Sequence, residues 1–228
     1  NSLGSVKLLN AAIKAGVQRF IYFSTAHVYG SPLSGTLTEE TLPRSQYPYA
    51  ITHKTAEDFI LAAHEKGEIN SVVLRLSNGF GCPERANVNR WTLLVNDLCK
   101  QAATKSKLVL HSSGIQERDF ITLTDVSRAV EHVLDMTDEQ TCNGLFNLGG
   151  DKSIKIIDVA ESVADRCNNI LNMKINIESV KNNKNESSNQ LVYSMEKIKS
   201  TGFDLESNIL EEIDNTLILC RDSFNENS

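Results

Sequence analysis

The sequence predicts an α/β fold in which buried parallel strands alternate with helices. Two short, uninterrupted apolar runs at 20–23 and 72–76 have the character of strands that are covered on both faces. Residues 49–64, which lie between them, have the spacing of a helix, and this strand–helix–strand order is typical of a parallel sheet. Before the first strand, apolar residues within 5–15 form the stripe of a helix that lies on a sheet, and Gly16 ends that helix.

The rest of the chain continues the alternation. Residues 181–190 are rich in Asn, Lys and Ser and predict a surface loop. A chain of 228 residues with 40% hydrophobic content can bury a sizeable core in one or two domains. Further helices are predicted at 91–103, 126–136, 157–167 and 209–220, and further strands at 108–110, 120–123, 144–148 and 173–178.

Composition argues against several classes of protein. The net charge of −6 and the absence of a basic cluster indicate that nucleic acid is not a partner. No apolar run approaches the roughly 18 residues of a membrane span. The five cysteines are scattered without a C-x-x-C spacing, and the five histidines never form H-x-x-x-H, so neither a disulfide framework nor a metal site is expected. We expect a cytoplasmic protein with no membrane partner.

One feature of dinucleotide-binding folds is missing from the sequence. Such folds begin with a strand, a G-x-G-x-x-G turn and a helix whose N-terminus holds the pyrophosphate. The chain shows no such turn and begins at Asn1 directly in a predicted helix. We therefore expect about three βα units, roughly 90 residues, upstream of it, and we interpret the chain as a fragment.

A series of short motifs, taken together, resembles a known family. In chain order they are NxxGS at 1–5, LLxAA at 8–12, GVxRF at 16–20, STAHVYG at 24–30, TEE at 38–40, PY at 48–49, RLSN at 75–78, GxP at 81–83, RDFI at 118–121, DV at 125–126 and NLGG at 147–150. Their order and intervals resemble those of the extended short-chain dehydrogenase/reductase family, of the NAD-dependent epimerase/dehydratase type that acts on nucleotide sugars. The resemblance covers roughly residues 1–220.

The resemblance implies a fold and a division of the chain. It implies the C-terminal part of a Rossmann-like doubly wound parallel sheet with a smaller α/β substrate-binding subdomain. Residues 1–80, with contributions from about 115–150, are expected to form the remaining half of the dinucleotide-binding domain. Residues 81–228 are expected to form mainly the substrate-binding subdomain.

The expected catalytic residues are Tyr49, Thr25 and His53. Hydride transfer at a carbinol needs a base for the hydroxyl proton, a second hydrogen-bonding group and a donor that stabilises the tyrosinate. By resemblance, Tyr49 is the base and Thr25 is the second group. The family usually has lysine four residues after the tyrosine, whereas this chain has His53. Lys54 is rotated by about 100° from the face of Tyr49, so we interpret His53 as the replacement and expect it to donate to the nicotinamide ribose.

The resemblance also implies a cofactor and a substrate. The cofactor is NAD or NADP, and the partner is a nucleotide-diphosphate sugar, with a homodimer as the expected assembly. A diphosphate is dianionic, and the guanidinium of Arg118 can hold it with paired hydrogen bonds. The implied substrate contacts are Thr25, Asn78 and Arg118. The implied cofactor contacts are Asn1, Ser24, Tyr49, His53 and Leu76.

The expected reaction is epimerisation or reduction of a sugar nucleotide. Members of the family that are 4,6-dehydratases carry an acidic pair after the threonine, and this chain has Ala26 and His27 there. The sequence leaves epimerase and reductase, and NAD and NADP, undecided. His53 and the missing glycine turn favour an alternative, a catalytically impaired binding or assembly protein on the same fold. A second alternative is a dehydrogenase of a non-sugar alcohol, which would need neither Asn78 nor Arg118.

Overall fold

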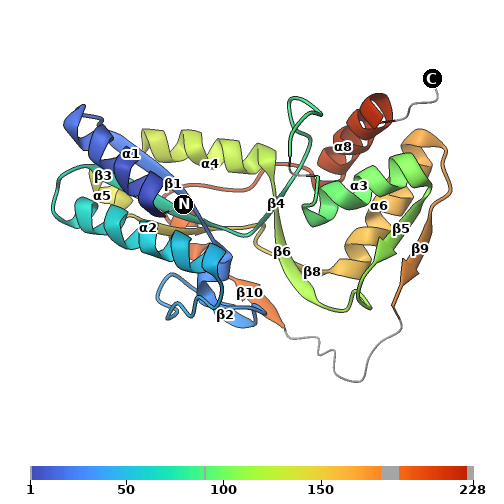
Figure 1. Ribbon diagram of the computed structural model, residues 1–228, viewed down its shortest axis with the longest axis horizontal. Coiled ribbons are helices and arrows are strands. Elements are labelled where there is room, and N and C mark those ends of the chain that lie inside the picture. The colour runs from blue at the N-terminus through green and yellow to red at the C-terminus, as the bar shows by residue number, and fades with distance from the viewer. Residues whose placement is uncertain (1, 90, 181–189, 225–228) are drawn as a thin grey trace. The chain divides into compact units, whose positions relative to one another are not determined.

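The computed structural model describes residues 2–89, 91–180 and 190–224. These residues form two compact units, each built from three separate stretches of chain (Figure 1). The first unit contains Asn1–Ser77, Val126–Asp151 and Leu191–Leu205. The second contains Asn78–Asp125, Lys152–Gln190 and Glu206–Ser228.

The first unit is organised around a parallel sheet in the order β1-β3-β7. All three strands run in the same direction, and Thr25 at the end of β1 pairs with Leu76 at the end of β3, so their carboxyl ends form one edge. The strands are β1 (Arg19–Thr25), β3 (Asn70–Leu76) and β7 (Leu145–Leu148). The predicted α/β class and parallel sheet are confirmed.

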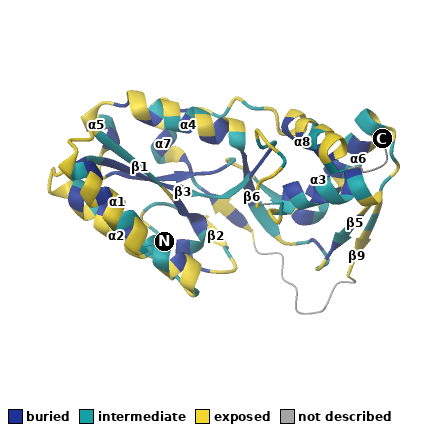
Figure 2. Ribbon diagram, turned by 45° about the horizontal axis from the view of Figure 1, so that its top comes forward, coloured by how far each residue is buried: buried dark blue, intermediate teal, exposed yellow. Residues whose placement is uncertain are grey.

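Helices cover both faces of this sheet. Figure 2 shows α1 (Ser2–Lys14) and α2 (Pro48–Glu65) on one side of β1 and β3 and α4 (Leu123–Asp135) on the other. Side chains from α1, α2 and the sheet form one apolar core, which includes Leu9, Ile60 and Val73. The burial of this shared core fixes both helices on the sheet, because apolar surface removed from water contributes roughly 25 cal/mol per Å².

The sequence explains where α2 begins and which face it buries. Pro48 stands at the first helical position, where its missing N–H costs nothing and its fixed φ suits the helix. The small residues Ala50, Ala56 and Ala63 are buried on the sheet side together with Ile60. The helix can therefore lie close to β1 and β3.

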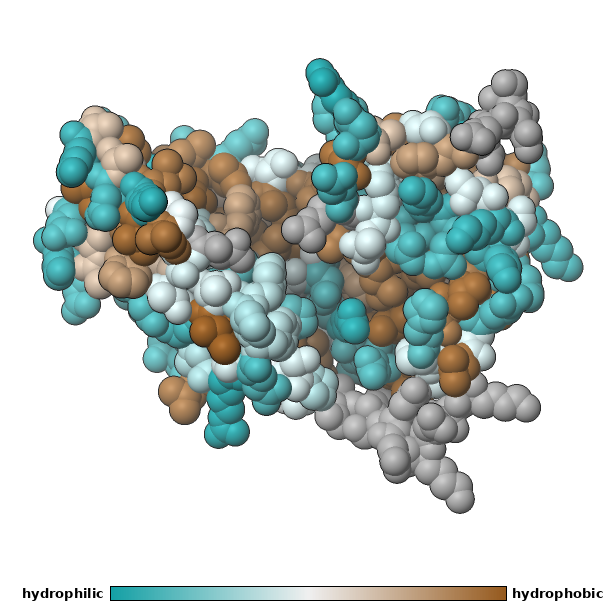
Figure 3. Space-filling model, viewed as in Figure 1, coloured by the Kyte–Doolittle hydropathy of each residue, from teal (hydrophilic) through white to brown (hydrophobic). Residues whose placement is uncertain are grey.

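The outer surfaces of α1 and α2 carry several large apolar side chains. Leu3 and Leu8 of α1 and Ile51 and Phe59 of α2 are between 47% and 69% exposed. Figure 3 shows apolar side chains among the polar ones on the face of the first unit that is turned to the viewer.

The second unit combines small sheets with three helices. Strands β4 (Asn78–Phe80) and β6 (Glu117–Thr122) are parallel, and β8 (Ser153–Lys155) joins β6 antiparallel. Strands β5 (Lys107–Leu110) and β9 (Asn176–Ser179) form a second, parallel pair. The helices α3 (Leu94–Lys105), α6 (Ile156–Leu171) and α8 (Ile209–Phe224) share a core with these strands. Cys99, Cys167 and Cys220 are buried in it as free thiols.

The remaining elements are short. They are the 3₁₀ turn η1 (Ala26–Tyr29), the parallel strands β2 (Gly35–Leu37) and β10 (Leu191–Tyr193), and the one-turn helices α5 (Asp138–Thr141) and α7 (Glu196–Lys199). None of the described helices combines the length and the apolar character needed to cross a membrane.

Most predicted elements are present, with different ends. The helix predicted at 91–103 begins only at Leu94, because Leu93 is extended, with φ −67° and ψ 135°. Residues 191–205 return to the first unit through β10 and α7. Most of the predicted loop, 181–189, lies outside the described residues.

Gly81, which follows β4, is held against the buried side chain of Glu212 in α8. A Cβ at position 81 would lie 2.1 Å from Glu212 Oε1, and the φ of +149° is itself unfavourable for other residues. Glu212 cannot easily move away, because its carboxylate accepts hydrogen bonds from Cys82 N and Thr124 Oγ1.

We expect Gly81→Ala to lower the free energy of unfolding by about 1–3 kcal/mol, measured by urea denaturation. The control is Gly4→Ala in α1, where nothing lies within 4 Å of the added Cβ and the change should stabilise the chain by up to about 1 kcal/mol. A Gly81→Ala variant as stable as the unsubstituted chain would contradict the constraint described.

Candidate functional site

The carboxyl edge of the first unit's sheet brings together three predicted site residues. Ser24 and Thr25 end β1, and Leu76 ends β3 opposite Thr25. Thr25 Oγ1 accepts a hydrogen bond from the N–H of His27 at 3.3 Å and thereby caps η1. The Ser24 hydroxyl is buried and has no hydrogen-bond partner among the described residues. A buried hydroxyl without a hydrogen-bond partner costs free energy, and a polar group of a ligand at this edge would supply the missing partner.

Tyr49 and His53 lie on one face of α2, as their spacing predicts. Their ring centroids are 4.5 Å apart. Tyr49 is 48% exposed, so its side chain is accessible at the start of the helix. The neighbouring Lys54 forms an ion pair with Asp58 instead. The helix register therefore brings His53, and not Lys54, into contact with the Tyr49 ring, while the predicted closeness of the Thr25 and Tyr49 hydroxyls stays a prediction.

His53 also contacts a second tyrosine, Tyr22 of β1. The Tyr22 hydroxyl lies 3.0 Å from His53 Nδ1. Burial lowers the pKa of His53, and the carboxylate of Glu57 opposes that shift. Burial likewise raises the pKa of Tyr22, so both groups favour their neutral forms at neutral pH.

Beneath His53, one turn further along α2, lies a buried ion pair. Arg75 of β3 donates from Nε to Glu57 Oε1 at 3.1 Å and from a terminal nitrogen to Glu57 Oε2 at 2.8 Å. The Glu57 side chain is 0% exposed and that of Arg75 is 3% exposed. Two parallel hydrogen bonds of this kind fix the orientation of the guanidinium as well as its distance from the carboxylate. The hydrogen bonds and charge of Glu57 raise the pKa of Arg75 against the effect of burial.

The ion pair continues into a buried network of hydrogen bonds. The Arg75 guanidinium lies 4.7 Å from the centre of the Tyr29 ring. Tyr29 donates to Asn147 Oδ1 at 2.6 Å. Tyr193 donates its one proton to the Arg75 carbonyl at 2.6 Å, and its hydroxyl oxygen lies 3.1 Å from Asn147 Oδ1. The backbone N–H of Asn147 donates to Glu39 Oε1 at 2.8 Å. Strands β3 and β7 are thus connected through side chains of η1 and β10 as well as through the sheet.

The two predicted diphosphate contacts, Asn78 and Arg118, belong to the second unit. Asn78 pairs with Phe120, and Arg118 lies two residues before Phe120 on β6, so both side chains share one face of the sheet. Both residues are half-buried. Asn78 Nδ2 donates to the carbonyl of Asp119 at 2.8 Å, which fixes the amide.

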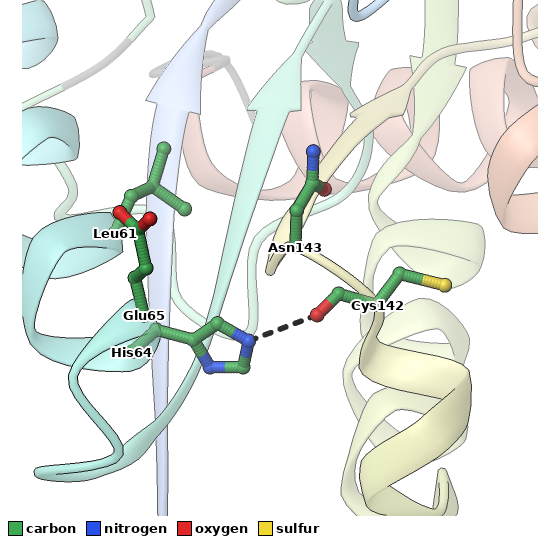
Figure 4. Close-up of a pocket in the computed structure, with 5 residues that line it drawn as sticks. All are labelled: Leu61, His64, Glu65, Cys142 and Asn143. Carbon is green, nitrogen blue, oxygen red and sulfur yellow. Dashed lines mark hydrogen bonds between the residues drawn. The ribbon is translucent and has the colours of Figure 1, made fainter.

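His64 illustrates a histidine with a structural role. It borders a hollow of about 510 Å³ together with Leu61, Glu65, Cys142 and Asn143 (Figure 4). Its Nδ1 accepts from the N–H of Ser71 at 3.0 Å, so Nε2 is the nitrogen that donates to the Cys142 carbonyl at 3.1 Å. Both nitrogens are occupied, and His64 connects the end of α2 to the turn before β7.

Asn1, a predicted cofactor contact, lies outside the described residues. Within the described parts of the chain, no group of three or more His, Cys, Asp or Glu side chains is arranged to hold a metal ion.

Tyr22 and Arg75 are not among the site residues that the sequence predicts. In the sequence, Tyr22 is one residue of the apolar run 20–23. Strand alternation contained a usable signal, because Tyr22 and Ser24 are two residues apart and Arg75 pairs with Ser24, so all three point to the face that α2 covers.

Comparisons with known proteins agree with this architecture. The model of the family described as "NAD dependent epimerase/dehydratase family" matches residues 1–149. The dTDP-D-glucose 4,6-dehydratase of Mus musculus is 30% identical over 166 residues, which are 72% of this chain and 44% of that protein. The chain therefore spans less than half the length of this curated relative.

Two solved structures show the same fold. A UDP-N-acetylglucosamine 4-epimerase from Methanobrevibacter ruminantium, in complex with UDP-N-acetylmuramic acid, matches 94% of this chain and 66% of its own, with 21% identity and a TM-score of 0.78. A UDP-glucuronic acid 4-epimerase from Bacillus cereus, in complex with NAD, matches 98% and 66%, with 20% identity and a TM-score of 0.78.

We expect Glu57→Gln to lower the free energy of unfolding by about 3–5 kcal/mol, because it leaves the Arg75 charge buried without its partner. The matched control is Asp58→Asn, one residue further on, where the side chain is 62% exposed and the effect should stay below about 1 kcal/mol. Urea denaturation of both variants measures the difference. Equal losses would show that the Glu57–Arg75 pair does not anchor α2.

Proposed function

The chain belongs to the NAD dependent epimerase/dehydratase family, and we propose that it contributes the catalytic and substrate-binding residues of an enzyme that acts on a nucleotide-diphosphate sugar with NAD or NADP. The observation that carries the proposal is the half-exposed Tyr49, whose ring contacts that of His53 at the start of α2. Of the reactions open to such an enzyme, we propose epimerisation or reduction.

The residues present fit the nicotinamide ribose of the proposed cofactor. Ser24 offers a buried hydroxyl that lacks a partner among the described residues, and it stands at the carboxyl edge of a parallel sheet. His53 Nε2 makes no hydrogen bond within the described part of the chain. Tyr49, His53, Ser24 and Leu76 are therefore the residues that would hold this end of the cofactor, which supplies or accepts a hydride when bound. The Bacillus cereus structure, which contains NAD, supports the choice of cofactor.

Each proposed catalytic side chain has a distinct task. Tyr49 exchanges a proton with the substrate hydroxyl, because a phenol at an accessible helix start can reach a bound sugar. Thr25 hydrogen-bonds the same oxygen and is itself oriented by the His27 N–H. His53 takes the position of the usual lysine beside Tyr49 and donates a hydrogen bond from a ring nitrogen to the nicotinamide ribose.

The residues after Thr25 support epimerisation or reduction over dehydration. Elimination of water needs an acid and a base at the sugar, and this chain has Ala26 and His27 where dehydratases have an acidic pair. Ala26 is buried and has no titratable group, so it supplies no acid. We propose epimerisation or reduction although the Mus musculus relative is named as a dehydratase.

The second unit supplies the proposed contacts to the diphosphate. Arg118 and Asn78 share one sheet face, and a guanidinium beside an amide suits a dianionic group. A neutral alcohol would need neither residue, which argues against a non-sugar substrate.

The surroundings of the site support two further parts of the proposal. The exposed apolar side chains of α1 and α2 suit the proposed homodimer, because contiguous apolar surface is often an interface. All five cysteines are free thiols, which suits the proposed cytoplasmic location.

One observation favours a second candidate function, a catalytically impaired binding or assembly protein. Neutral imidazole stabilises a tyrosinate less than an ammonium does, and burial keeps the His53 side chain neutral by lowering its pKa. This candidate predicts that nucleotide sugar binds but is not converted.

Turnover of nucleotide sugars by the full-length protein with NAD or NADP tests the proposal. Tyr49→Phe should lower turnover by about 10²–10⁴-fold, because it removes the proton-transfer group. His53→Ala should lower it by about 10²-fold, and His53→Lys should preserve or raise it. Lys54→Ala is the control and should change little, since Lys54 pairs with Asp58. A wild-type protein that binds nucleotide sugar without turnover would support the second candidate.

Nucleotide affinity tests the role of the second unit. We expect Arg118→Ala to weaken binding of a nucleoside diphosphate by about 10- to 100-fold in calorimetric titration, because it removes charge-assisted hydrogen bonds. Lys107→Ala removes an exposed cation of the same unit that pairs with Glu178, and it should leave the affinity unchanged. Equal effects of the two substitutions would mean that Arg118 acts only through the overall charge.

A further inference from the structure

The two ring nitrogens of His53 have different surroundings. Nδ1 lies 3.0 Å from the Tyr22 hydroxyl, whereas Nε2 makes no hydrogen bond with any described residue. An imidazole offers one donor and one acceptor when neutral, and the partner of one nitrogen decides the state of the other. The group that is hydrogen-bonded to Nδ1 therefore decides whether Nε2 of His53 carries a proton and acts as a donor.

We propose that Tyr22 is a positioning residue for His53, whose phenol donates to Nδ1 and so holds the imidazole in the Nε2–H form with a fixed ring orientation. This inference rests on the proposed function in one respect, which is the use of the Nε2–H group beside Tyr49. The hydrogen bond itself belongs to the folded chain and can be tested without turnover.

The direction of the hydrogen bond follows from the protonation of the two groups. Burial raises the pKa of Tyr22, so the phenol keeps its proton at neutral pH and can donate it to His53 Nδ1, which lies 3.0 Å away. Burial lowers the pKa of His53, which keeps Nδ1 available as an acceptor at neutral pH.

The placement of Tyr22 makes it a rigid support. It stands in the middle of β1, paired with Val73 of β3, so its backbone is fixed by the sheet. His53 is on α2, and the rings of Tyr22 and Tyr49 lie 5.8 and 4.5 Å from its ring. The imidazole is therefore held at one nitrogen by Tyr22 of the sheet, while its ring contacts Tyr49 of the helix.

The replacement of lysine creates the need for such a support. An ammonium carries three rotatable donors and works in any of several rotations, whereas a neutral imidazole has one donor whose position depends on the tautomer. Among the described residues, the other titratable groups near His53 are Tyr49 and Glu57 of α2, and Glu57 is paired with Arg75 of β3. None of these three contacts Nδ1 by a hydrogen bond in the described structure, so Tyr22 alone determines the tautomer.

The first test is nitrogen NMR of His53 in the full-length protein. We expect the wild type to show the Nε2–H tautomer alone, and Tyr22→Phe to show a mixture of tautomers with a raised pKa for His53, because a bond that favours the neutral ring is lost. Tyr47→Phe removes a phenol hydroxyl that makes no hydrogen bond to His53 and serves as the control. Unchanged tautomer and titration in Tyr22→Phe, or the same change in Tyr47→Phe, overturns the proposal.

The second test is a double-substitution cycle on turnover by the full-length protein. Tyr22→Phe should lower kcat by about 3- to 10-fold with little change in the KM for the nucleotide sugar, which corresponds to one hydrogen bond. In the His53→Lys background the same substitution should have almost no effect, because lysine needs no tautomer support. Equal losses in both backgrounds would mean that Tyr22 acts only through packing, and this would overturn the proposal.

The two tests separate failure of the inference from failure of the proposed function. If the full-length protein turns over no nucleotide sugar, the proposed function fails, and the NMR comparison still decides whether Tyr22 sets the state of His53. If turnover is normal and the NMR of Tyr22→Phe is unchanged, the proposed function stands and the positioning role is wrong.

Discussion

The ion pair between Glu57 and Arg75 is the interaction on which the arrangement of the site depends. It joins the middle of α2 to β3 by two parallel hydrogen bonds in a region without solvent access. Such a pair cannot be broken cheaply, because either charge alone would remain buried. A rotation or slide of α2 would break it, so the pair fixes the register of the helix against the sheet. His53 and Tyr49 stand one and two turns before Glu57 on the same face, and their positions follow from it.

The same guanidinium connects the site to the far strand of the sheet. Arg75 lies against Tyr29, and both Tyr29 and Tyr193 reach Asn147 of β7. The backbone N–H of Asn147, on the outer strand β7, donates to the side chain of Glu39 and not to another strand. Buried polar groups that pair with one another favour one arrangement, since an alternative would leave more of them unpaired. The first unit is thus defined by polar contacts as much as by its apolar core.

The long elements and the helix face of the site could be predicted from the sequence, and the contacts across elements could not. Periodicity over ten or more residues predicts α2 and α8, and a spacing of four predicts that Tyr49 and His53 meet. Strands of three residues, such as β4 and β10, are too short to show a period. The contacts of Tyr22 with His53 and of Arg75 with Glu57 join residues that are 31 and 18 positions apart. Strand alternation places Tyr22 on the face of Ser24, but its hydrogen-bond partner cannot be predicted until the neighbouring helix is placed.

The division of the chain between its two units limits how the protein can be altered as a whole. The chain passes from one unit to the other after residues 77, 125, 151, 190 and 205. Neither unit is therefore a contiguous gene segment, and no single truncation or crossover point releases one of them intact. Either unit must therefore be altered by point changes and loop insertions, because its exchange as a cassette would require several coordinated joins.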